Sequence, residues 1–152
     1  MKKILLCGAG FIGTNFYKLF RDKYRIVTFD IGDYAYTLGN GLFDIDNVGS
    51  ESNFYKGDIS VFQNIKQVIE EVNPDYIINF AAKSHVDRSI HEEDTFIKTN
   101  VIGVENLLKI VRDNKIRLVH ISTDEIYGDL PLDSTYEFKE EDKLNPSSPY
   151  SA

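Results

Sequence analysis

The stretch Lys3-Ile4-Leu5-Leu6-Cys7-Gly8-Ala9-Gly10-Phe11-Ile12-Gly13 runs from an apolar segment through three glycines into a segment with helical periodicity. Its Gly-x-Gly-x-x-Gly spacing allows a tight turn, a close approach of the backbone to a pyrophosphate, and close packing of a helix on a strand. The helix N-terminus that follows attracts negative charge. The stretch therefore predicts a dinucleotide-binding fold, and a tight turn without a ligand is the alternative interpretation.

Asp30 ends the second apolar segment, about 20 residues after Gly10. At this position of a dinucleotide-binding fold, an acid accepts hydrogen bonds from the ribose hydroxyls of NAD. The negative charge of the same acid would repel the 2′-phosphate of NADP. The sequence therefore predicts NAD as the cofactor.

Short apolar segments alternate with segments of helical period, which is typical of a parallel sheet covered by helices. We expect five strands, at residues 3–7, 25–29, 53–56, 76–80 and 117–122. With right-handed crossovers, this pattern predicts an α/β, Rossmann-type, doubly wound parallel sheet in the order 3-2-1-4-5. A sixth strand and a smaller substrate domain are not found, so residues 1–152 are interpreted as an incomplete NAD-binding domain.

Three helices are expected: one from Phe11 or Ile12 to before Tyr24, one from after Ser60 to Pro74, and one over residues 95–113. Ser60 and Gln63 match a capping box for the second helix. The third helix carries an apolar stripe on one side, at Ile97, Val101, Val104, Leu107, Leu108 and Val111. Residues 31–52 and 129–149 have no regular period, and irregular segments of this length are usually functional.

The composition is that of one globular domain, with 42% hydrophobic residues, 27% charged residues and a net charge of -7. This acidic balance, without a basic run, disfavours nucleic acids and membranes as partners. One cysteine excludes a disulfide framework, and three histidines without ligand spacing predict no metal site. The apolar segment that follows Met1-Lys2-Lys3 is too short for a signal peptide or a membrane-spanning helix, so we expect a cytoplasmic protein.

Candidate ligand-binding residues follow the third and fourth expected strands, at the edge of the sheet where ligands of such folds bind. Asp58 and Ile59 follow the third strand, although an acid stabilised by a helix N-terminus is the alternative interpretation of Asp58. The small residues Ala81 and Ala82 follow the fourth strand and would let a flat cofactor ring lie against the backbone. Asn100, within an otherwise apolar helix, is either a structural bridge or an organiser of the site.

The fifth expected strand ends in Ser122-Thr123-Asp124-Glu125, which brings a hydroxyl and two carboxylates to the same edge of the sheet. Adjacent carboxyl groups in a cleft can have their pKa values moved apart, so that one acts as an acid and the other as a base. A solvated turn that caps a helix is the alternative interpretation. Tyr150 has no functional signal in its local sequence.

Four segments together resemble the extended short-chain dehydrogenases and, within them, the dTDP-glucose 4,6-dehydratases. The four segments are residues 8–13, 81–90 (Ala-Ala-Lys-Ser-His-Val-Asp-Arg-Ser-Ile), 120–129 (His-Ile-Ser-Thr-Asp-Glu-Ile-Tyr-Gly-Asp) and 146–152 (Pro-Ser-Ser-Pro-Tyr-Ser-Ala). The resemblance covers about the first half of such an enzyme. It implies an NAD-dependent conversion of a nucleotide-linked glucose to its 4-keto-6-deoxy form with loss of water, and a homodimer for the complete enzyme.

The resemblance also implies roles for individual residues. Tyr150 would take the proton of the sugar's 4-hydroxyl, and Thr123 would hold that hydroxyl. Glu125 would abstract the proton next to the new ketone, and Asp124 would protonate the departing 6-hydroxyl. Ser84 would face the substrate. The NAD site would be lined by Gly8, Gly10, Phe11, Ile12, Gly13, Asp30, Asp58, Ile59, Phe80, Ala81, Ala82 and Thr99.

The chain departs from the family pattern at three places. Cys7 stands where a glycine is usual, so its side chain is expected to crowd the pyrophosphate, and Lys83 stands where Glu or Gln is common. The family's lysine four positions after the catalytic tyrosine, which lowers the pKa of that tyrosine, is not within residues 1–152. We therefore expect no useful turnover from these residues alone. We also expect self-association, because the fifth strand at the edge of the sheet is unpaired.

Two alternatives to the dehydratase remain. The first is another enzyme of the family, a UDP-sugar dehydratase or an epimerase. An epimerase is disfavoured by the pair Asp124-Glu125, because epimerisation eliminates no water. The second alternative is a nucleotide-binding module without catalysis.

Overall fold

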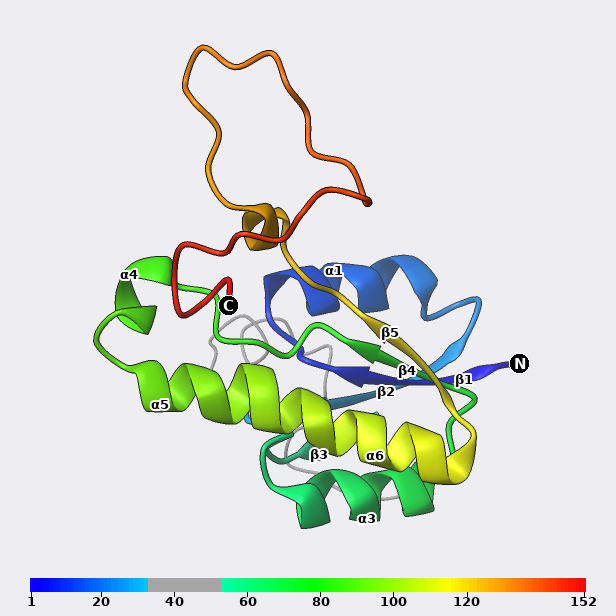
Figure 1. Ribbon diagram of the computed structural model, residues 1–152. Helices are drawn as coiled ribbons and strands as arrows, with labels where there is room; N and C mark the ends of the chain where they lie inside the picture. Colours follow the sequence, from blue (N-terminus) through cyan, green and yellow to red (C-terminus); the bar gives the residue numbers. More distant parts are fainter. Residues whose placement is uncertain (33–52) are drawn as a thin grey trace.

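A five-stranded parallel sheet forms the centre of the computed structural model, which describes residues 1–32 and 53–152 (Figure 1). The strands are β1 (Lys3–Cys7), β2 (Arg25–Asp30), β3 (Phe54–Lys56), β4 (Tyr76–Asn79) and β5 (Arg117–His120). Their order is β3-β2-β1-β4-β5, and every neighbouring pair is parallel. The predicted fold class and strand order are confirmed. The chain reverses its direction of winding between β1 and β4, and ligands of such sheets bind at this switch point.

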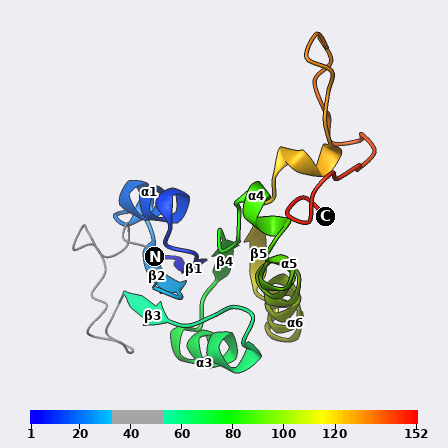
Figure 2. The same ribbon diagram turned by 90° about the vertical axis from the view of Figure 1, so that its left-hand side faces the viewer.

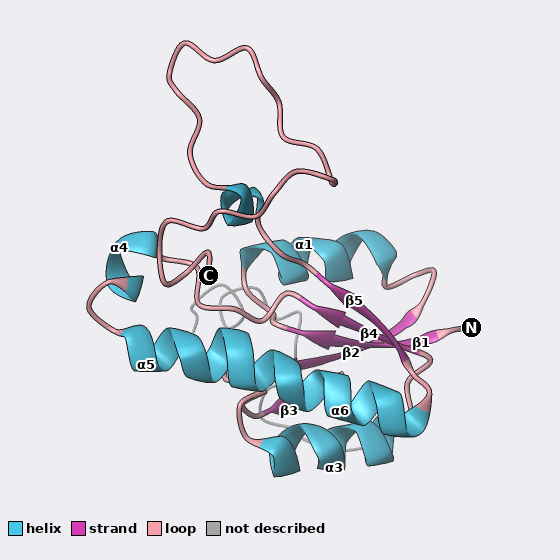
Figure 3. Ribbon diagram, in the orientation of Figure 1, coloured by secondary structure: helices cyan, strands magenta, loops and turns pink. Residues whose placement is uncertain are grey.

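Helices cover both faces of the sheet (Figures 2 and 3). They are α1 (Phe11–Phe20), α3 (Phe62–Val72), α4 (Val86–Ser89), α5 (Glu93–Phe96), the π-helix η1 (Ile97–Gly103), α6 (Val104–Asn114) and the 3-10 helix η2 (Asp124–Tyr127). Alternate residues of β1 enter two cores: Leu5 packs with residues of α3 and α6, and Leu6 packs with Tyr17 of α1. Burial on both faces is the reason that the strands have continuous apolar runs.

The segments α5, η1 and α6 form one continuous helical rod beside the sheet (Figure 1), and the predicted apolar stripe is buried only in part. Ile97, Val101 and Leu108 of the stripe are 49%, 56% and 53% exposed, whereas Leu107 is fully buried. The rod also buries Phe96 and Ile110, which lie outside the stripe. Asn100 and Gly103 lie on the inner face as well. Because neither is a large apolar residue, the hydrophobic pattern did not indicate this part of the face.

Gly103 is required on this inner face by close packing. A Cβ atom at Gly103 would lie 2.6 Å from the side chain of Ile59. The rod therefore approaches the loop between β3 and α3 more closely than any other residue type would allow.

The predicted capping box at the start of α3 is wrong. The helix is preceded by Val61 in an extended conformation, and no side chain caps its first N–H groups. The backbone N–H of Ser60 instead donates to Oδ1 of Asp58 at 2.8 Å. The carboxylate of Asp58 accepts this hydrogen bond because residues 58–60 form an Asx turn, which ends two residues before α3 begins.

The two segments predicted to be irregular have different outcomes. Residues 33–52 lie outside the described residues. The prediction for residues 129–149 is confirmed, because they contain no regular element and project from the body of the molecule (Figures 1 and 2). The carboxylate of Asp142 organises this projecting loop, since it accepts hydrogen bonds from the Tyr136 hydroxyl and the Lys139 backbone N–H, each at 2.7 Å. The same contact with Asp142 raises the pKa of the Tyr136 phenol.

Two further features of the described residues concern their surface. β5 lies at the edge of the sheet, and Val119 within it is 46% exposed. Over residues 1–32 and 53–152, none of the helices combines the length and the apolar character needed to cross a membrane.

Thr28 is expected to destabilise the sheet, because its side chain is fully buried and its Oγ1 has no hydrogen-bond partner among the described residues. Thr28→Val would remove this hydroxyl and keep the branched shape. We expect the free energy of unfolding in urea to rise by about 1 kcal/mol. Thr14→Val is the matched control: the buried Thr14 hydroxyl donates to the Ala9 carbonyl at 2.7 Å, so this change should lower stability. Equal losses in both variants would contradict the prediction.

Candidate functional site

Three cavities lie along the carboxyl ends of the strands, and together they contain most of the predicted site residues. The Asp30 cavity has a volume of about 280 Å³ and is lined by residues after β2, β3 and β4 and by α5 and η1. The glycine-turn cavity, of about 300 Å³, is lined by residues 10–13, Phe80, Ser84 and His85. The Tyr150 cavity, of about 170 Å³, is lined by the rod, the end of β5 and residues 149–152. Parallel strands bring these segments together because all their carboxyl ends meet at one edge.

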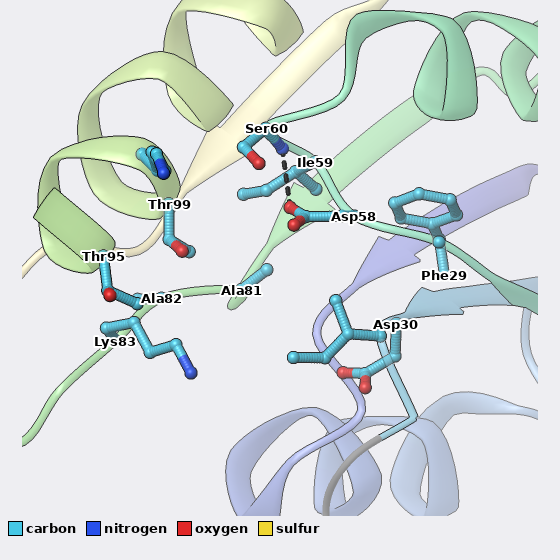
Figure 4. A pocket seen from close by; sticks show the side chains of 13 residues that line it. Phe29, Asp30, Asp58, Ile59, Ser60, Ala81, Ala82, Lys83, Thr95 and Thr99 are labelled. Carbon is cyan, nitrogen blue, oxygen red and sulfur yellow. Dashed lines mark hydrogen bonds between the residues drawn. The ribbon is translucent and has the colours of Figure 1, made fainter.

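The Asp30 cavity holds six of the residues predicted to line the NAD site (Figure 4). These six are Asp30, Asp58, Ile59, Ala81, Ala82 and Thr99. Lys83, noted above as a departure from the family pattern, also lines the cavity, and so do Phe29, Ser60, Thr95 and Lys98, which the sequence did not indicate. Thr95 and Lys98 could not be found from the sequence, because their position depends on the face that the rod turns to the sheet.

The carboxylate of Asp30 is nearly buried, with 8% of the residue exposed, and it is held by two backbone N–H groups. Its Oδ2 accepts from Ala9 at 2.7 Å, and its Oδ1 accepts from Gly32 at 2.7 Å. A carboxylate offers about four lone-pair positions, so two of them remain for a ligand. Asp30 therefore both ties β2 to the glycine turn and presents acceptors to the cavity.

Asp58 lies in the loop after β3 and lines the same cavity (Figure 4). Its hydrogen bond from Ser60 holds the loop in a turn. Asn106 of α6 supports this loop from below, because its Nδ2 donates to the carbonyls of Ile59 and Ser60 at 2.9 and 3.0 Å. The buried Asn106 was not predicted, and the only signal in the sequence was an amide within an apolar helix.

A different structural reason explains why glycine occupies each of the three positions of the turn. Gly8 has φ of +92°, and a Cβ atom there would lie 2.5 Å from the backbone nitrogen of Ala81. A Cβ atom at Gly13 would lie 1.9 Å from the carbonyl oxygen of Gly8. At Gly10, by contrast, a Cβ atom would meet nothing within 4 Å. Gly8 and Gly13 thus allow the packing of strand and helix, whereas Gly10 leaves open space on the ligand side.

The N-terminus of α1 borders this open space. No side chain caps α1, and its first turn contains no acidic residue. Phe11 and Ile12 line the glycine-turn cavity and are 71% and 59% exposed. The arrangement suits an anionic ligand, because unpaired N–H groups and the positive end of the helix dipole face the cavity.

Cys7 does not crowd this turn, so the expectation drawn from its departure from the family pattern is wrong. Its side chain is fully buried in the core formed with α3 and α6, and it lines none of the three cavities. Burial raises the pKa of the thiol, which is therefore unreactive.

The Tyr150 cavity brings two of the four predicted catalytic residues together. Thr123 and Tyr150 both line it, with Ala82, which also lines the Asp30 cavity. Oγ1 of Thr123 accepts a hydrogen bond from the backbone N–H of Glu125 at 3.3 Å and caps η2. Asp124 and Glu125 lie in the first turn of η2, exposed beside Thr123, and do not line the cavity. Ser84, paired with Thr123 in the substrate prediction, lines the glycine-turn cavity instead.

A pair of polar residues that the sequence reasoning missed supports the Tyr150 cavity. The fully buried Asn79 accepts from the backbone N–H of Ala81 through Oδ1 at 3.1 Å, and its Nδ2 lies 3.0 Å from Nδ1 of His120. Because the Asn79 amide nitrogen can only donate, Nδ1 of His120 accepts and the ring proton lies on Nε2. Burial lowers the pKa of His120, which also favours the neutral ring.

Comparisons with known proteins agree with this architecture. The profile of the GDP-mannose 4,6 dehydratase family matches residues 5–152. The dTDP-glucose 4,6-dehydratase of Mycobacterium tuberculosis strain H37Rv is 40% identical over 152 residues, which are 100% of this chain and 45% of that protein. The Salmonella typhimurium dTDP-glucose 4,6-dehydratase is 37% identical over 171 residues, covering 100% of this chain and 47% of that protein. The chain thus spans about half the length of these relatives.

Solved structures show the same similarity. The dTDP-glucose 4,6-dehydratase of Bacillus anthracis in complex with NAD matches with a TM-score of 0.77 and 37% identity, over 99% of this chain and 46% of that one. The UDP-glucose 4-epimerase of Brucella ovis in complex with NAD also matches with a TM-score of 0.77, at 26% identity, over 99% of this chain and 44% of that one. The resemblance found in the four sequence segments is confirmed. The chain belongs to the GDP-mannose 4,6 dehydratase family.

Proposed function

We propose that this chain is the NAD-binding portion of a dTDP-glucose 4,6-dehydratase. The observation that carries the proposal is the placement of the cofactor residues and of Thr123 and Tyr150 in adjacent cavities that share Ala82. The identity of 40% to a protein named for this activity supports the substrate. The pair Asp124-Glu125 favours a dehydratase over the epimerases of similar fold, because the elimination of water needs both an acid and a base.

The residues of the chain fit NAD. The adenosine part would lie in the Asp30 cavity, where the remaining acceptor positions of the Asp30 carboxylate suit ribose hydroxyls. The diphosphate would lie at the open backbone of Gly10 and the uncapped N-terminus of α1. Phe80, Ser84 and the exposed Phe11 and Ile12 would enclose the continuation of the cofactor.

In the proposed reaction, each polar residue of the Tyr150 region moves or holds one proton. Tyr150 takes the proton of the sugar's 4-hydroxyl, and Thr123 holds that hydroxyl. Glu125 removes the proton next to the resulting ketone, and Asp124 delivers a proton to the departing 6-hydroxyl. The residues of the Asp30 and glycine-turn cavities would hold NAD, which would supply the acceptor and donor of the hydride that leaves the sugar and returns to it. The acid and the base are neighbours on η2, so both can serve one elimination.

The test is the product formed by the complete protein, as its gene encodes it, from dTDP-glucose and NAD. We expect a nucleotide sugar lighter by one water, with the keto and methyl signals of a 4-keto-6-deoxy sugar in NMR spectra. UDP-glucose, offered separately, should be converted more slowly. An epimerised product, or NAD binding without any conversion, would overturn the proposal in favour of an epimerase or a non-catalytic module.

Two further expectations accompany this proposal. Residues 1–152 alone should bind NAD without useful turnover, and the complete protein should be a homodimer. We expect the dimer to cover the part of the rod that lines no cavity, where Leu108 is 53% exposed.

A further inference from the structure

Lys83 lies on the segment that separates the Asp30 cavity from the glycine-turn cavity. Lys83 lines the first cavity, and its successors Ser84 and His85 line the second. Figure 4 shows its side chain directed into the same opening as the Asp30 carboxylate. Lys83 therefore lies at the point of the chain where the lining of one cavity gives way to the lining of the other.

The ammonium group of Lys83 forms no ion pair within residues 1–32 and 53–152. The carboxylates of Asp30 and Asp58 line the same cavity, and both accept backbone N–H groups. A half-buried cation that lines a cavity and is not held in an ion pair is available to bind an anion.

The backbone of Lys83 is held in place by one side chain. Oδ1 of Asn100 accepts from the Lys83 N–H at 2.9 Å, and Nδ2 of Asn100 donates to the Lys83 carbonyl at 2.9 Å. Asn100 thus satisfies both backbone groups of Lys83, as a neighbouring strand would. Asn100 lies in η1, and π-helical turns occur frequently at functional sites.

These contacts combine the two interpretations that the sequence left open for Asn100. It bridges to the backbone of Lys83, which lines the Asp30 cavity, and Asn100 itself lines the Tyr150 cavity. The glycine-turn cavity, which Ser84 and His85 of the same segment line, also borders the open backbone of Gly10 and the uncapped N-terminus of α1. An anion that reaches both cavities would therefore meet N–H groups in one and the Lys83 ammonium in the other.

We propose that Lys83 is a binding residue for the phosphate groups of the dinucleotide and that Asn100 is its positioning residue. The inference rests on the proposed NAD site and adds to it a charge contact that comes from β4 rather than from the glycine turn. Because the contact is ionic, it predicts a component of cofactor affinity that salt weakens.

The test is calorimetric titration of the complete protein with NAD, ADP and adenosine, at low and high sodium chloride. Lys83→Gln should raise the Kd of NAD and of ADP about tenfold at low salt, which corresponds to about 1.4 kcal/mol, because it removes a charge-assisted hydrogen bond. The same change should leave the Kd of adenosine unaltered, because adenosine carries no phosphate. Lys83→Arg should keep most of the affinity, and Lys83→Gln should lose most of the salt dependence.

Lys18→Gln is the matched control, because it removes the same charge from an exposed position at the far end of α1. It should alter neither affinity nor salt dependence. Asn100→Ala should weaken ADP binding in the wild-type background and have little further effect in the Lys83→Gln background, as expected for two residues that act through one contact. If Asn100→Ala does not fold, the Lys83 variants still decide the charge contact.

The outcomes separate this inference from the proposed function. Unchanged NAD and ADP affinities in Lys83→Gln, or an equal loss of adenosine affinity, would overturn the phosphate contact and leave the NAD site standing. A wild-type protein that binds neither NAD nor ADP would overturn the proposed function itself.

Discussion

Replacing Glu125 with glutamine is expected to lower kcat of the complete protein for dTDP-glucose by about a thousandfold, the size of a lost general base. Glutamine keeps the shape of the side chain, and the backbone N–H of residue 125 can still donate to Oγ1 of Thr123. What it cannot do is remove the proton next to the ketone. Steady-state rates measure the loss, and the incorporation of solvent deuterium next to the ketone, which we expect in the wild type, should disappear.

Two observations make this prediction specific to the chemistry. The Kd of NAD should be unchanged in Glu125→Gln, because Glu125 lines none of the three cavities. Glu141→Gln makes the same chemical change on the exposed projecting loop of residues 129–149 and should retain the wild-type kcat. A Glu125→Gln protein with wild-type kcat and deuterium incorporation would show that another residue is the base.

Gly13→Ala is expected to have the largest effect on folding. The new methyl group would lie 1.9 Å from the backbone carbonyl oxygen of Gly8. The methyl carbon is bonded directly to Cα and the oxygen belongs to the backbone, so no side-chain rotation can relieve the contact. The strand β1 and the helix α1 would have to separate, which should cost about 3 kcal/mol or more. Urea unfolding followed by circular dichroism measures this loss, and failure to accumulate folded protein agrees with it.

Gly10→Ala is the matched substitution within the same turn, and it should separate binding from folding. Gly10 has φ of -66°, which any residue adopts, and the added methyl group would meet no protein atom within 4 Å. The variant should therefore unfold close to the wild-type urea concentration. Because the methyl group would occupy the space assigned to the diphosphate, the Kd of NAD should rise at least about tenfold. Equal loss of stability in both variants would contradict the distinct roles of the two glycines.

Local sequence was enough to predict the fold and several residues that line the Asp30 cavity. The strand order follows from continuous apolar runs, the helical segments between them and the handedness of crossovers. The positions of residues 30, 58–59 and 81–82 could be predicted because they end or follow strands, and the carboxyl ends of parallel strands lie at one edge of the sheet. These features depend on residues that are neighbours in the chain.

Features that join distant residues could not be predicted in this way. The face that the rod turns to the sheet depends on Asn100 and Gly103, whose partners Lys83 and Ile59 lie elsewhere in the sequence. The proton on Nε2 of His120 depends in the same way on the buried Asn79 of a neighbouring strand.

By itself, the sequence determined the glycine turn, the order of the strands and which residues reach the carboxyl edge, since short-range periodicity and steric limits control them. Only the tertiary structure decided which side chains share a cavity. It placed Thr123 with Tyr150, separated Ser84 from both, buried Cys7 away from the turn and left Lys83 outside the ion pairs of the described residues. The physical reason is that packing and hydrogen bonding between distant segments, rather than local propensity, set the direction of each side chain.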